Sequence, residues 1–123
     1  MKEIRKELIE KAWEERSLLQ NEEVRLEILR TIELLDDGVI RVAEPSGNEW
    51  VVNQWIKKAV ILYFPIMKVE TSEAGPIEYN DKIPLKGDYA AKGVRVVPGA
   101  VARYGSFISQ GVILMPSFVN IGA

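Results

Sequence analysis

Residues 93–123, GVRVVPGAVARYGSFISQGVILMPSFVNIGA, decide the fold because they repeat with a period of six. Small residues stand six apart throughout this stretch: Gly93, Gly99, Gly105, Gly111, Ser117 and Ala123. Two places after four of them come apolar residues at the same spacing: Val101, Phe107, Ile113 and Val119. A helix repeats about every 3.6 residues and a strand every two, so neither produces this pattern. It is typical of a coil with three short flat faces, in which each strand contributes one inward aliphatic residue and each corner needs a small one.

Arg95 interrupts the expected inward column. It occupies the place six residues before Val101, where the next aliphatic side chain is expected. An unpaired charge is costly inside such a prism, so either the coil begins after Arg95 or Arg95 faces an anionic partner. The alternative is an arginine that closes the first coil by pairing with a nearby acid.

The repeat also stops early. Residues 97–123 supply only four or five strands, and a solenoid needs several stacked turns to bury its core. The last stretch would leave an uncharged edge strand unpaired, which natural sheets avoid. We therefore expect this sequence to be the front part of a longer protein.

The first half of the chain is predicted to be mainly helical. Apolar residues at helical spacing predict helices over 2–18, 22–37 and 53–64. Asn21 is a suitable N-cap for the second helix, because its side chain can accept a hydrogen bond from a free amide of the first turn. Pro65 is expected to end the third helix.

The rest of this region predicts one hairpin and little else. A strand over 39–43, a turn at 45–48 and a return strand over 49–52 form the expected hairpin. Residues 66–93 are punctuated by Gly and Pro and indicate only a short helix over 88–92. The predicted fold class is therefore α+β, with a helical domain and a short hairpin over 1–94 and the start of the six-residue repeat over 95–123.

Composition excludes several classes of chemistry. The 123 residues include no His and no Cys, which removes Ser-His-Asp hydrolysis, thiol chemistry, disulfides and the usual zinc ligands. Sixteen Lys and Arg against eighteen Asp and Glu give a net charge of −2, which provides no basic patch for nucleic acid or a membrane surface.

The ends of the chain give no targeting signal. The start, MKEIRKELIE, is charged at once and lacks the apolar run of a signal peptide. Residues 104–123 contain no charge over twenty residues, but their glycines, serines and Pro116 make a poor helix. We expect a cytoplasmic protein with no membrane-spanning helix.

Five stretches of the sequence resemble one enzyme family. They are LLDDGVIRVAE (34–44), WVVNQWIKKAVILYF (50–64), DKIPLK (81–86), RVVPGAVARYGSFI (95–108) and VILMPSFVNIGA (112–123). Together they resemble the tetrahydrodipicolinate N-succinyltransferases over essentially the whole chain. The resemblance implies a helical N-terminal domain followed by the first coils of a left-handed parallel β-helix built from hexapeptide repeats.

The resemblance also implies an activity and a role for one residue. It implies transfer of a succinyl group from succinyl-CoA to tetrahydrodipicolinate, in the diaminopimelate route to lysine, by a homotrimer with active sites between neighbouring β-helices. The arginine of the family's RVVP motif binds a substrate carboxylate, and this position is Arg95. The family's catalytic aspartate and CoA-binding coils correspond to positions beyond Ala123. We therefore expect no catalytic, cofactor-binding or metal-binding residue among residues 1–123, and no activity from them alone.

Two other functions fit the same residues. The first is a hexapeptide acyltransferase that acts on a different amine, which a period of six cannot distinguish. The second is a non-catalytic module in which the hexads form a trimer and the helices recruit a partner. The uncharged surface of residues 104–123 supports it, because such a surface is typical of an interface.

Overall fold

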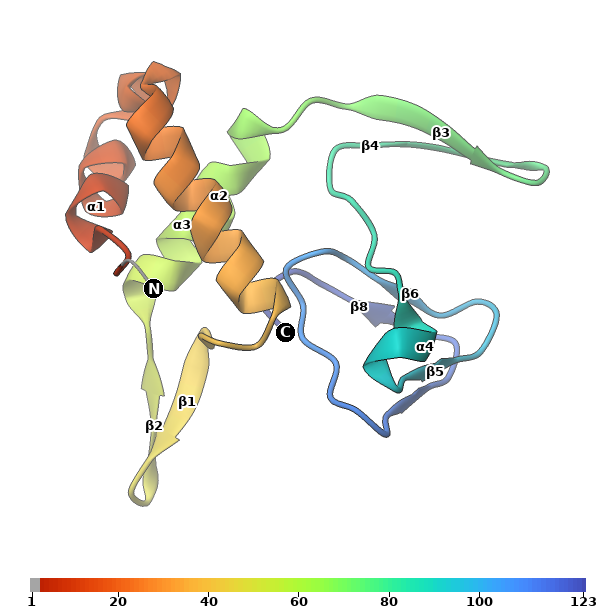
Figure 1. The fold of residues 1–123 in the computed structure, drawn as a ribbon. Helices are drawn as coiled ribbons and strands as arrows, with labels where there is room; N and C mark the ends of the chain where they lie inside the picture. The colour runs from red at the N-terminus through yellow and green to blue at the C-terminus, as the bar shows by residue number, and fades with distance from the viewer. Residues whose placement is uncertain (1–2) are drawn as a thin grey trace.

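Three helices pack against one another at the N-terminal end of the chain (Figure 1). The structure is a computed structural model that describes residues 3–123. The helical elements of this part, which we call the helical unit, are α1 (Lys6–Glu14), a short 3₁₀ helix η1 (Arg16–Gln20), α2 (Glu22–Asp36) and α3 (Gln54–Ile66). Within residues 3–123, no helix is both long enough and apolar enough to cross a membrane.

The predicted helices are confirmed with changes at their ends. The first stops at Glu14 because Glu15 is extended, and η1 then turns the chain so that Leu19 is buried. Lys2, the predicted start, lies outside the described residues. Asn21 caps α2 as expected, since its side chain accepts a hydrogen bond from the Val24 amide at 3.2 Å. The third helix continues through Pro65 to Ile66, where a proline in the last turn removes only one backbone hydrogen bond.

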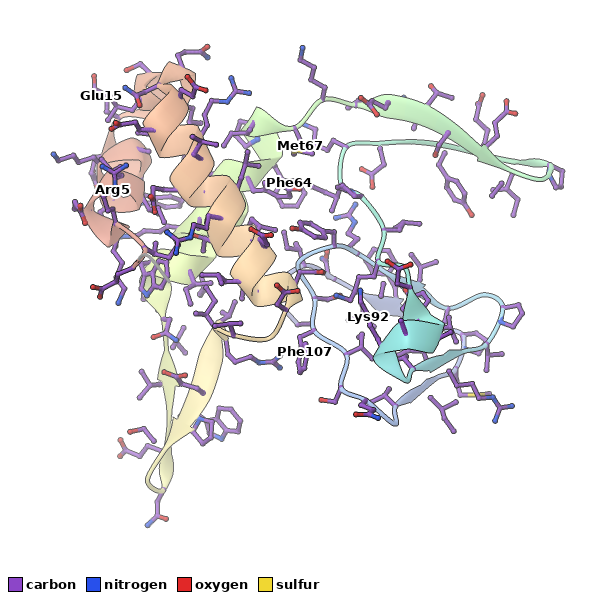
Figure 2. The ribbon with its side chains drawn as sticks, viewed as in Figure 1. Arg5, Glu15, Phe64, Met67, Lys92 and Phe107 are labelled. Carbon is purple, nitrogen blue, oxygen red and sulfur yellow. The ribbon has the colours of Figure 1, made fainter. Side chains whose placement is uncertain are left out.

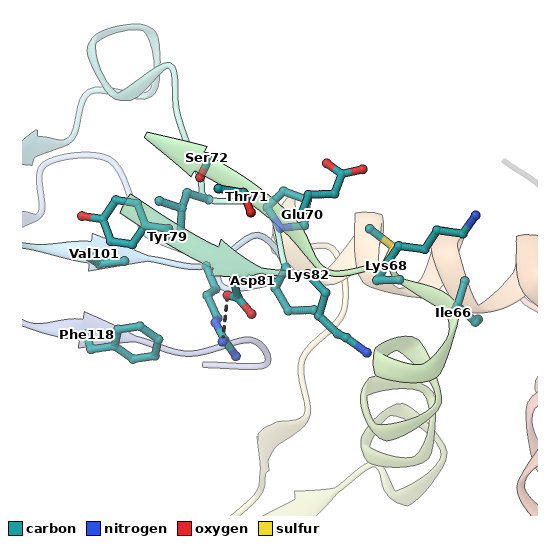
Figure 3. Close-up of a pocket in the computed structure, with 15 residues that line it drawn as sticks. Ile66, Lys68, Glu70, Thr71, Ser72, Tyr79, Asp81, Lys82, Val101 and Phe118 are labelled. Carbon is teal, nitrogen blue, oxygen red and sulfur yellow. Dashed lines mark hydrogen bonds and ion pairs between the residues drawn. The ribbon is translucent and has the colours of Figure 1, made fainter. Parts of the chain in front are cut away.

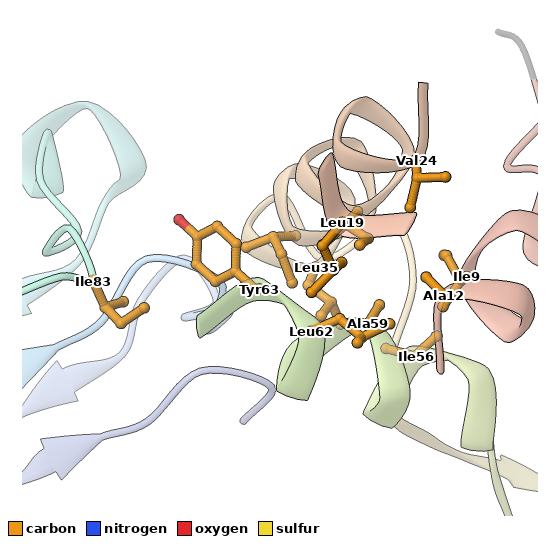
Figure 4. Close-up of a cluster of buried hydrophobic side chains, with 12 residues drawn as sticks. Ile9, Ala12, Leu19, Val24, Leu35, Ile56, Ala59, Leu62, Tyr63 and Ile83 are labelled. Carbon is orange, nitrogen blue, oxygen red and sulfur yellow. The ribbon is translucent and has the colours of Figure 1, made fainter. Parts of the chain in front are cut away.

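The main core lies between these helices. Its buried side chains are Ile9, Ala12, Leu19, Val24, Ile28, Ile32, Leu35, Ile56, Ala59, Leu62, Tyr63 and Ile83. Ile83 comes from the segment after the helices and lies at the edge of the cluster (Figure 4). Tyr104 and Ile121 pack against the same cluster from the C-terminal end of the chain. The helical core therefore extends to residues that belong to the six-residue repeat.

Two hairpins project from the body of the protein (Figure 1). The first pairs β1 (Ala43–Ser46) with β2 (Glu49–Val52) around a two-residue turn. The strand predicted over 39–43 is therefore placed too early, and residues 39–42 lie outside the strand. Ile40 and Val42 pack against the helical core instead, which draws this segment away from the hairpin.

The second hairpin was not predicted. It pairs β3 (Glu70–Ala74) with β4 (Ile77–Asp81) in antiparallel register. The dipeptide Gly75-Pro76 at its tip is a turn signal that could have revealed it. The short helix expected over 88–92 is confirmed as α4 (Tyr89–Lys92).

Short parallel pairs organise residues 93–123, which we call the C-terminal segment. Strand β5 (Arg95–Val96) pairs with β7 (Ile113–Leu114), and β6 (Val101–Ala102) pairs with β8 (Phe118–Val119). Partners are 18 residues apart in the first pair and 17 in the second, because Arg95 lies opposite Ile113 and Val101 lies opposite Phe118. Four glycines six residues apart have positive φ, at 93, 99, 105 and 111. The period of six is therefore confirmed up to Gly111 and shortens by one residue afterwards.

The interior of this segment differs by one position from the prediction. Its cluster contains Val96, Ala102, Ile108 and Leu114, each of which follows a predicted inward position or Arg95 by one residue. Ile113 is 54% exposed, so its placement in the inward column is wrong, whereas Val119 does pack inside because of the shortened second coil. A period of six gives the spacing of the inward residues but does not say which residue of each hexad points inward. The predicted positions and the positions one residue later are both mostly apolar, so the sequence could not distinguish them. The mixed α+β architecture with a helical N-terminal unit is confirmed.

A buried ion pair holds the C-terminal segment to the helical unit. The Lys86 Nζ lies 2.6 Å from Asp36 Oδ1, and the two side chains are only 3% and 10% exposed. The Gly105 amide donates to the same Oδ1 at 2.8 Å. The Lys86 amide in turn donates to the Ala102 carbonyl at 2.9 Å. The end of α2, the segment after β4 and the first turns of the repeat therefore meet at one carboxylate.

Close packing supports the same junction. A Cβ atom on Gly105 would lie 2.7 Å from Ile121 Cγ1 and 3.1 Å from Ile32 Cγ2. Phe107, predicted to point into the coil, lies instead beside the end of α2 (Figure 2). A Cβ on Gly38 would lie 2.6 Å from its ring, and the Arg41 guanidinium lies 5.3 Å from the ring centroid. The two parts approach so closely that only glycine fits at both contact points.

We predict that Lys86→Met destabilises the protein by about 3–5 kcal/mol, because it leaves the buried Asp36 carboxylate without its cation. Lys58→Met is the matched control. The Lys58–Glu10 pair has the same 2.6 Å separation, but its side chains are 27% and 43% exposed, so we expect a loss of at most about 1 kcal/mol. Urea unfolding of the three proteins measures both values. Equal losses would show that burial of the Asp36 pair is unimportant.

The tyrosines around Asp36 make the free energy of unfolding depend on pH in the alkaline range. Burial, and then the Asp36 charge, raise the pKa of Tyr104 to about 12. Between pH 10 and 12 the unfolded chain releases this proton and the folded protein keeps it, so stability falls as pH rises. We predict a shallower fall in Tyr104→Phe, measured as the free energy of unfolding against pH. Identical slopes in the two proteins would contradict the raised pKa.

Candidate functional site

Arg95, the predicted substrate-binding residue, lies on the outer face of the C-terminal segment. Its amide donates to the Val112 carbonyl at 3.0 Å, and its Cα pairs with that of Ile113 in the parallel ladder. Both residues are exposed, and the adjacent Val96 and Leu114 pack inside. Arg95 therefore does not interrupt the inward column. The prediction that it places a charge at an inward position of the coil is wrong. The backbone displays it outward instead.

The guanidinium of Arg95 is open to an external anion. None of the ion pairs between residues 3–123 involves it, so the alternative of closing the coil through a local acid has no support from the described contacts. A guanidinium displayed in this way can bind a carboxylate through two parallel hydrogen bonds. Lys92 of α4 is also exposed, but it lies outside the parallel ladder that places Arg95 on this face.

A groove of about 710 Å³ lies elsewhere, between the β3–β4 hairpin and the C-terminal segment (Figure 3). Most of its lining side chains are apolar, including Leu85, Val101 and Phe118. Its size and apolar character are within the range of ligand or partner sites. Arg95 does not line this groove, and the sequence analysis singled out no residue of it as functional.

Arg103 is the best-connected cation of the groove. Its Nη2 lies 3.1 Å from Asp81 Oδ2, and its Nη1 donates to Asn120 Oδ1 at 3.3 Å. The guanidinium also lies over the Phe118 and Phe64 rings, 5.5 and 5.9 Å from their centroids. These contacts tie the base of the β3–β4 hairpin to the C-terminal segment. Because the Arg103 guanidinium is already paired with Asp81 and Asn120, its charge is less available to a ligand.

The described residues offer one exposed guanidinium and one partly apolar groove. Within residues 3–123, no group of three or more His, Cys, Asp or Glu side chains could hold a metal ion. The acids of the groove, Glu70 and Asp81, are exposed and belong to the hairpin. The arrangement can bind an anion at Arg95 and an apolar partner in the groove.

Comparison with known proteins identifies the relationship. Residues 5–66 match the family described as "Tetrahydrodipicolinate N-succinyltransferase N-terminal". The chain is 47% identical over 128 aligned residues to the 2,3,4,5-tetrahydropyridine-2,6-dicarboxylate N-succinyltransferase of Pseudoalteromonas translucida, a match that covers 96% of this chain and 46% of the relative. The protein of the same name from Bordetella avium is 49% identical over 125 residues, covering 94% and 46%.

The matches cover the chain almost completely, but the chain spans slightly less than half the length of these relatives. The matched residues cover the helical unit and the β1–β2 hairpin. The chain therefore belongs to the tetrahydrodipicolinate N-succinyltransferase family.

Proposed function

We propose that the chain is the N-terminal part of a cytoplasmic enzyme that transfers a succinyl group from succinyl-CoA to tetrahydrodipicolinate, in the diaminopimelate route to lysine. The observation that carries this proposal is the identity of 47% across 96% of the chain with a relative that bears this activity in its name. Water adds to the cyclic imine and opens the ring, which frees the acceptor amino group. This amine attacks the thioester carbonyl, an amide bond to the succinyl group forms as the carbon–sulfur bond breaks, and CoA leaves as the thiol with the proton that the amine loses. In this proposal CoA is a co-substrate, and the reaction requires no resident cofactor or metal from this part of the protein.

We infer that the C-terminal segment is the first coil of a left-handed parallel β-helix. Supporting this are the parallel pairs with offsets of 18 and 17 residues and the positive-φ glycines at each sixth position. Three hexads make one complete turn of eighteen residues, which is the first of these offsets. The boundary of the two domains then falls between residues 94 and 95, and handedness rests on the family alone.

Arg95 is the proposed anchor for a carboxylate of the acceptor. The acceptor carries two carboxylates, and a planar guanidinium is the best bidentate partner for one of them. The outward position of Arg95 supports this role, as does its absence from the ion pairs found among residues 3–123. The catalytic aspartate and the coils that grip CoA lie beyond Ala123 in this proposal, so residues 1–123 are inactive alone. The assembly is a homotrimer with sites between neighbouring copies, and neither nucleic acid nor a membrane is a partner.

One observation favours a second candidate function, a non-catalytic trimerisation module. Three large apolar side chains of the C-terminal segment are more than half exposed, namely Ile113, Met115 and Phe118. Such a surface suits an interface whether or not the protein is an enzyme. An acyltransferase with another amine acceptor is the third candidate. The kinetic test below separates the first candidate from the other two, because only the first requires acyl transfer to the dicarboxylate.

We predict that Arg95→Ala in the complete protein lowers kcat/KM for the dicarboxylate acceptor about ten- to a hundredfold, the loss of a charge-assisted pair of roughly 1.5–3 kcal/mol. The KM for succinyl-CoA should change little. Arg95→Lys should recover only part of the loss, because an ammonium cannot form the two-pronged contact. Steady-state kinetics with each substrate varied in turn measure these values.

Lys92→Ala is the control for this experiment, since it removes a neighbouring exposed cation and should leave the acceptor kinetics unchanged. Unchanged acceptor kinetics in Arg95→Ala would assign Arg95 a structural role. An equal loss for both substrates would indicate a damaged assembly rather than a lost carboxylate contact. Absence of any acyl transfer by the complete parent protein would refute the proposed enzyme.

A further inference from the structure

The corner of the C-terminal segment that precedes β7 carries a polar side chain with no role so far, Gln110. The Gly111 amide, next to it, donates to the Gly93 carbonyl at 2.8 Å. Two residues further along each strand, Arg95 lies opposite Ile113. Gln110 and Arg95 are both exposed. Gln110 therefore lies at the edge of the outer face that displays Arg95.

Gly93 allows the Gln110 side chain to lie against the backbone. A Cβ atom on Gly93 would lie 2.7 Å from Gln110 Cγ, 3.4 Å from its Nε2 and 3.5 Å from its Cδ. The whole side chain, with its carboxamide, is therefore packed across residue 93 at the surface. Two residues of an extended strand span about 6.6 Å, so the carboxamide is within reach of a molecule that the Arg95 guanidinium binds.

The Gln110 carboxamide is available to a ligand. None of the side-chain hydrogen bonds found among residues 3–123 uses it. A carboxamide has two N–H donors and one carbonyl acceptor, and it carries no charge. Gln110 therefore supplies a neutral donor beside the cationic donor Arg95.

The charges of this part of the chain favour a ligand that is rich in oxygen. Residues 89–123 contain no Asp or Glu, and their cations are Lys92, Arg95 and Arg103. Arg103 is paired with Asp81. A ligand oxygen that reaches Arg95 and Gln110 therefore meets donors, and no carboxylate from residues 89–123 repels it.

The proposed acceptor presents two adjacent oxygen groups at one of its ends. When its ring opens, the carbon next to one carboxylate becomes a ketone, and the carbon next to the other carboxylate carries the amine. The amine has to stay free to attack the thioester. A guanidinium beside a neutral amide donor therefore matches the keto acid end, with the carboxylate on the guanidinium and the ketone oxygen on the amide.

We propose that Gln110 is a specificity-determining residue, whose Nε2 donates a hydrogen bond to the ketone oxygen of the acceptor while Arg95 holds the adjacent carboxylate. This inference rests on the proposed function and adds one contact to it. The contact would let the site distinguish a keto acid from a saturated dicarboxylate, because the hydrogen bond is lost when the ketone oxygen is missing.

Two dicarboxylates that cannot react test this contact by calorimetry with the complete protein. 2-Oxopimelate has the keto acid end but no amine, and pimelate lacks the ketone oxygen as well. We expect the parent protein to bind 2-oxopimelate about three- to tenfold more tightly than pimelate, as one neutral hydrogen bond allows. Gln110→Met keeps a side chain of similar length but has no N–H donor, so it should bind the two equally.

Ser109→Ala is the matched control, since it removes a neighbouring exposed hydroxyl at the same corner and should keep the preference of the parent. Kinetics give a second readout. Gln110→Met should raise the KM for the acceptor about three- to tenfold and leave the KM for succinyl-CoA unchanged. This effect should be smaller in an Arg95→Ala background, because the amide contact depends on the anchored carboxylate.

Three results would overturn the proposal. One is a parent protein that binds 2-oxopimelate and pimelate equally, and another is a Gln110→Met protein that keeps the parent's preference. The third is an equal loss in Ser109→Ala, which would indicate a disturbed corner rather than a lost contact. If the complete parent protein transfers succinyl groups in any of these cases, only the Gln110 contact is rejected. Absence of acyl transfer by the parent would instead reject the proposed function on which the contact rests.

Discussion

One carboxylate oxygen of Asp36 joins three parts of the chain that are far apart in sequence. It accepts hydrogen bonds from Lys86 Nζ, fifty residues away, and from the Gly105 amide, sixty-nine residues away. A buried carboxylate is tolerated only when its hydrogen bonds and its counter-charge are present together. The end of α2 therefore fixes the position of the segment after β4 and of the first turns of the repeat. Burial of the tyrosine side chains, and then the negative charge of Asp36, raise the pKa of Tyr63, Tyr89 and Tyr104.

This junction determines which faces of the C-terminal segment are free. Phe107 is used for contact with Gly38 and Arg41 at the end of the helical unit. The β5–β7 pair keeps Arg95 and Ile113 exposed, and the β6–β8 pair faces the groove. Each of the three faces therefore has a different environment. A segment that turned differently on the helical unit would expose a different set of residues, so the proposed substrate anchor depends on Asp36.

Local signals in the sequence predicted much of this structure. The stripe of apolar residues and the Asn21 cap gave α2 almost to the residue, because helix period and capping are local effects. The six-residue spacing of glycines predicted the corners, but it left the phase open, and the inward column was assigned one residue too early. That error matters for the candidate site, since Arg95 had been selected as a charge inside the coil. The family motif and the outward position of Arg95, and not the period, support its role.

Long-range contacts were beyond a reading of the sequence. Asp36 sits next to the Asp37-Gly38 helix end, where an acidic residue looks like part of an ordinary terminus. Nothing in DKIPLK marks Lys86 as its partner. The β3–β4 hairpin was missed because none of its strand residues is buried, so no hydrophobic alternation reports it. The groove that this hairpin forms with Val101 and Phe118 depends on folding and could not be predicted from any single stretch.

Native-state hydrogen exchange at the Gly105 amide is the most direct measurement of this junction, because that amide donates to Asp36 Oδ1. If the helical unit and the C-terminal segment are held together by Asp36, Gly105 and the core amides of α2 should open with the same free energy and the same dependence on denaturant. Exchange at Gly105 through an opening that is cheaper by more than about 1.4 kcal/mol, a factor of ten, while α2 stays protected, would show instead that the segment detaches on its own.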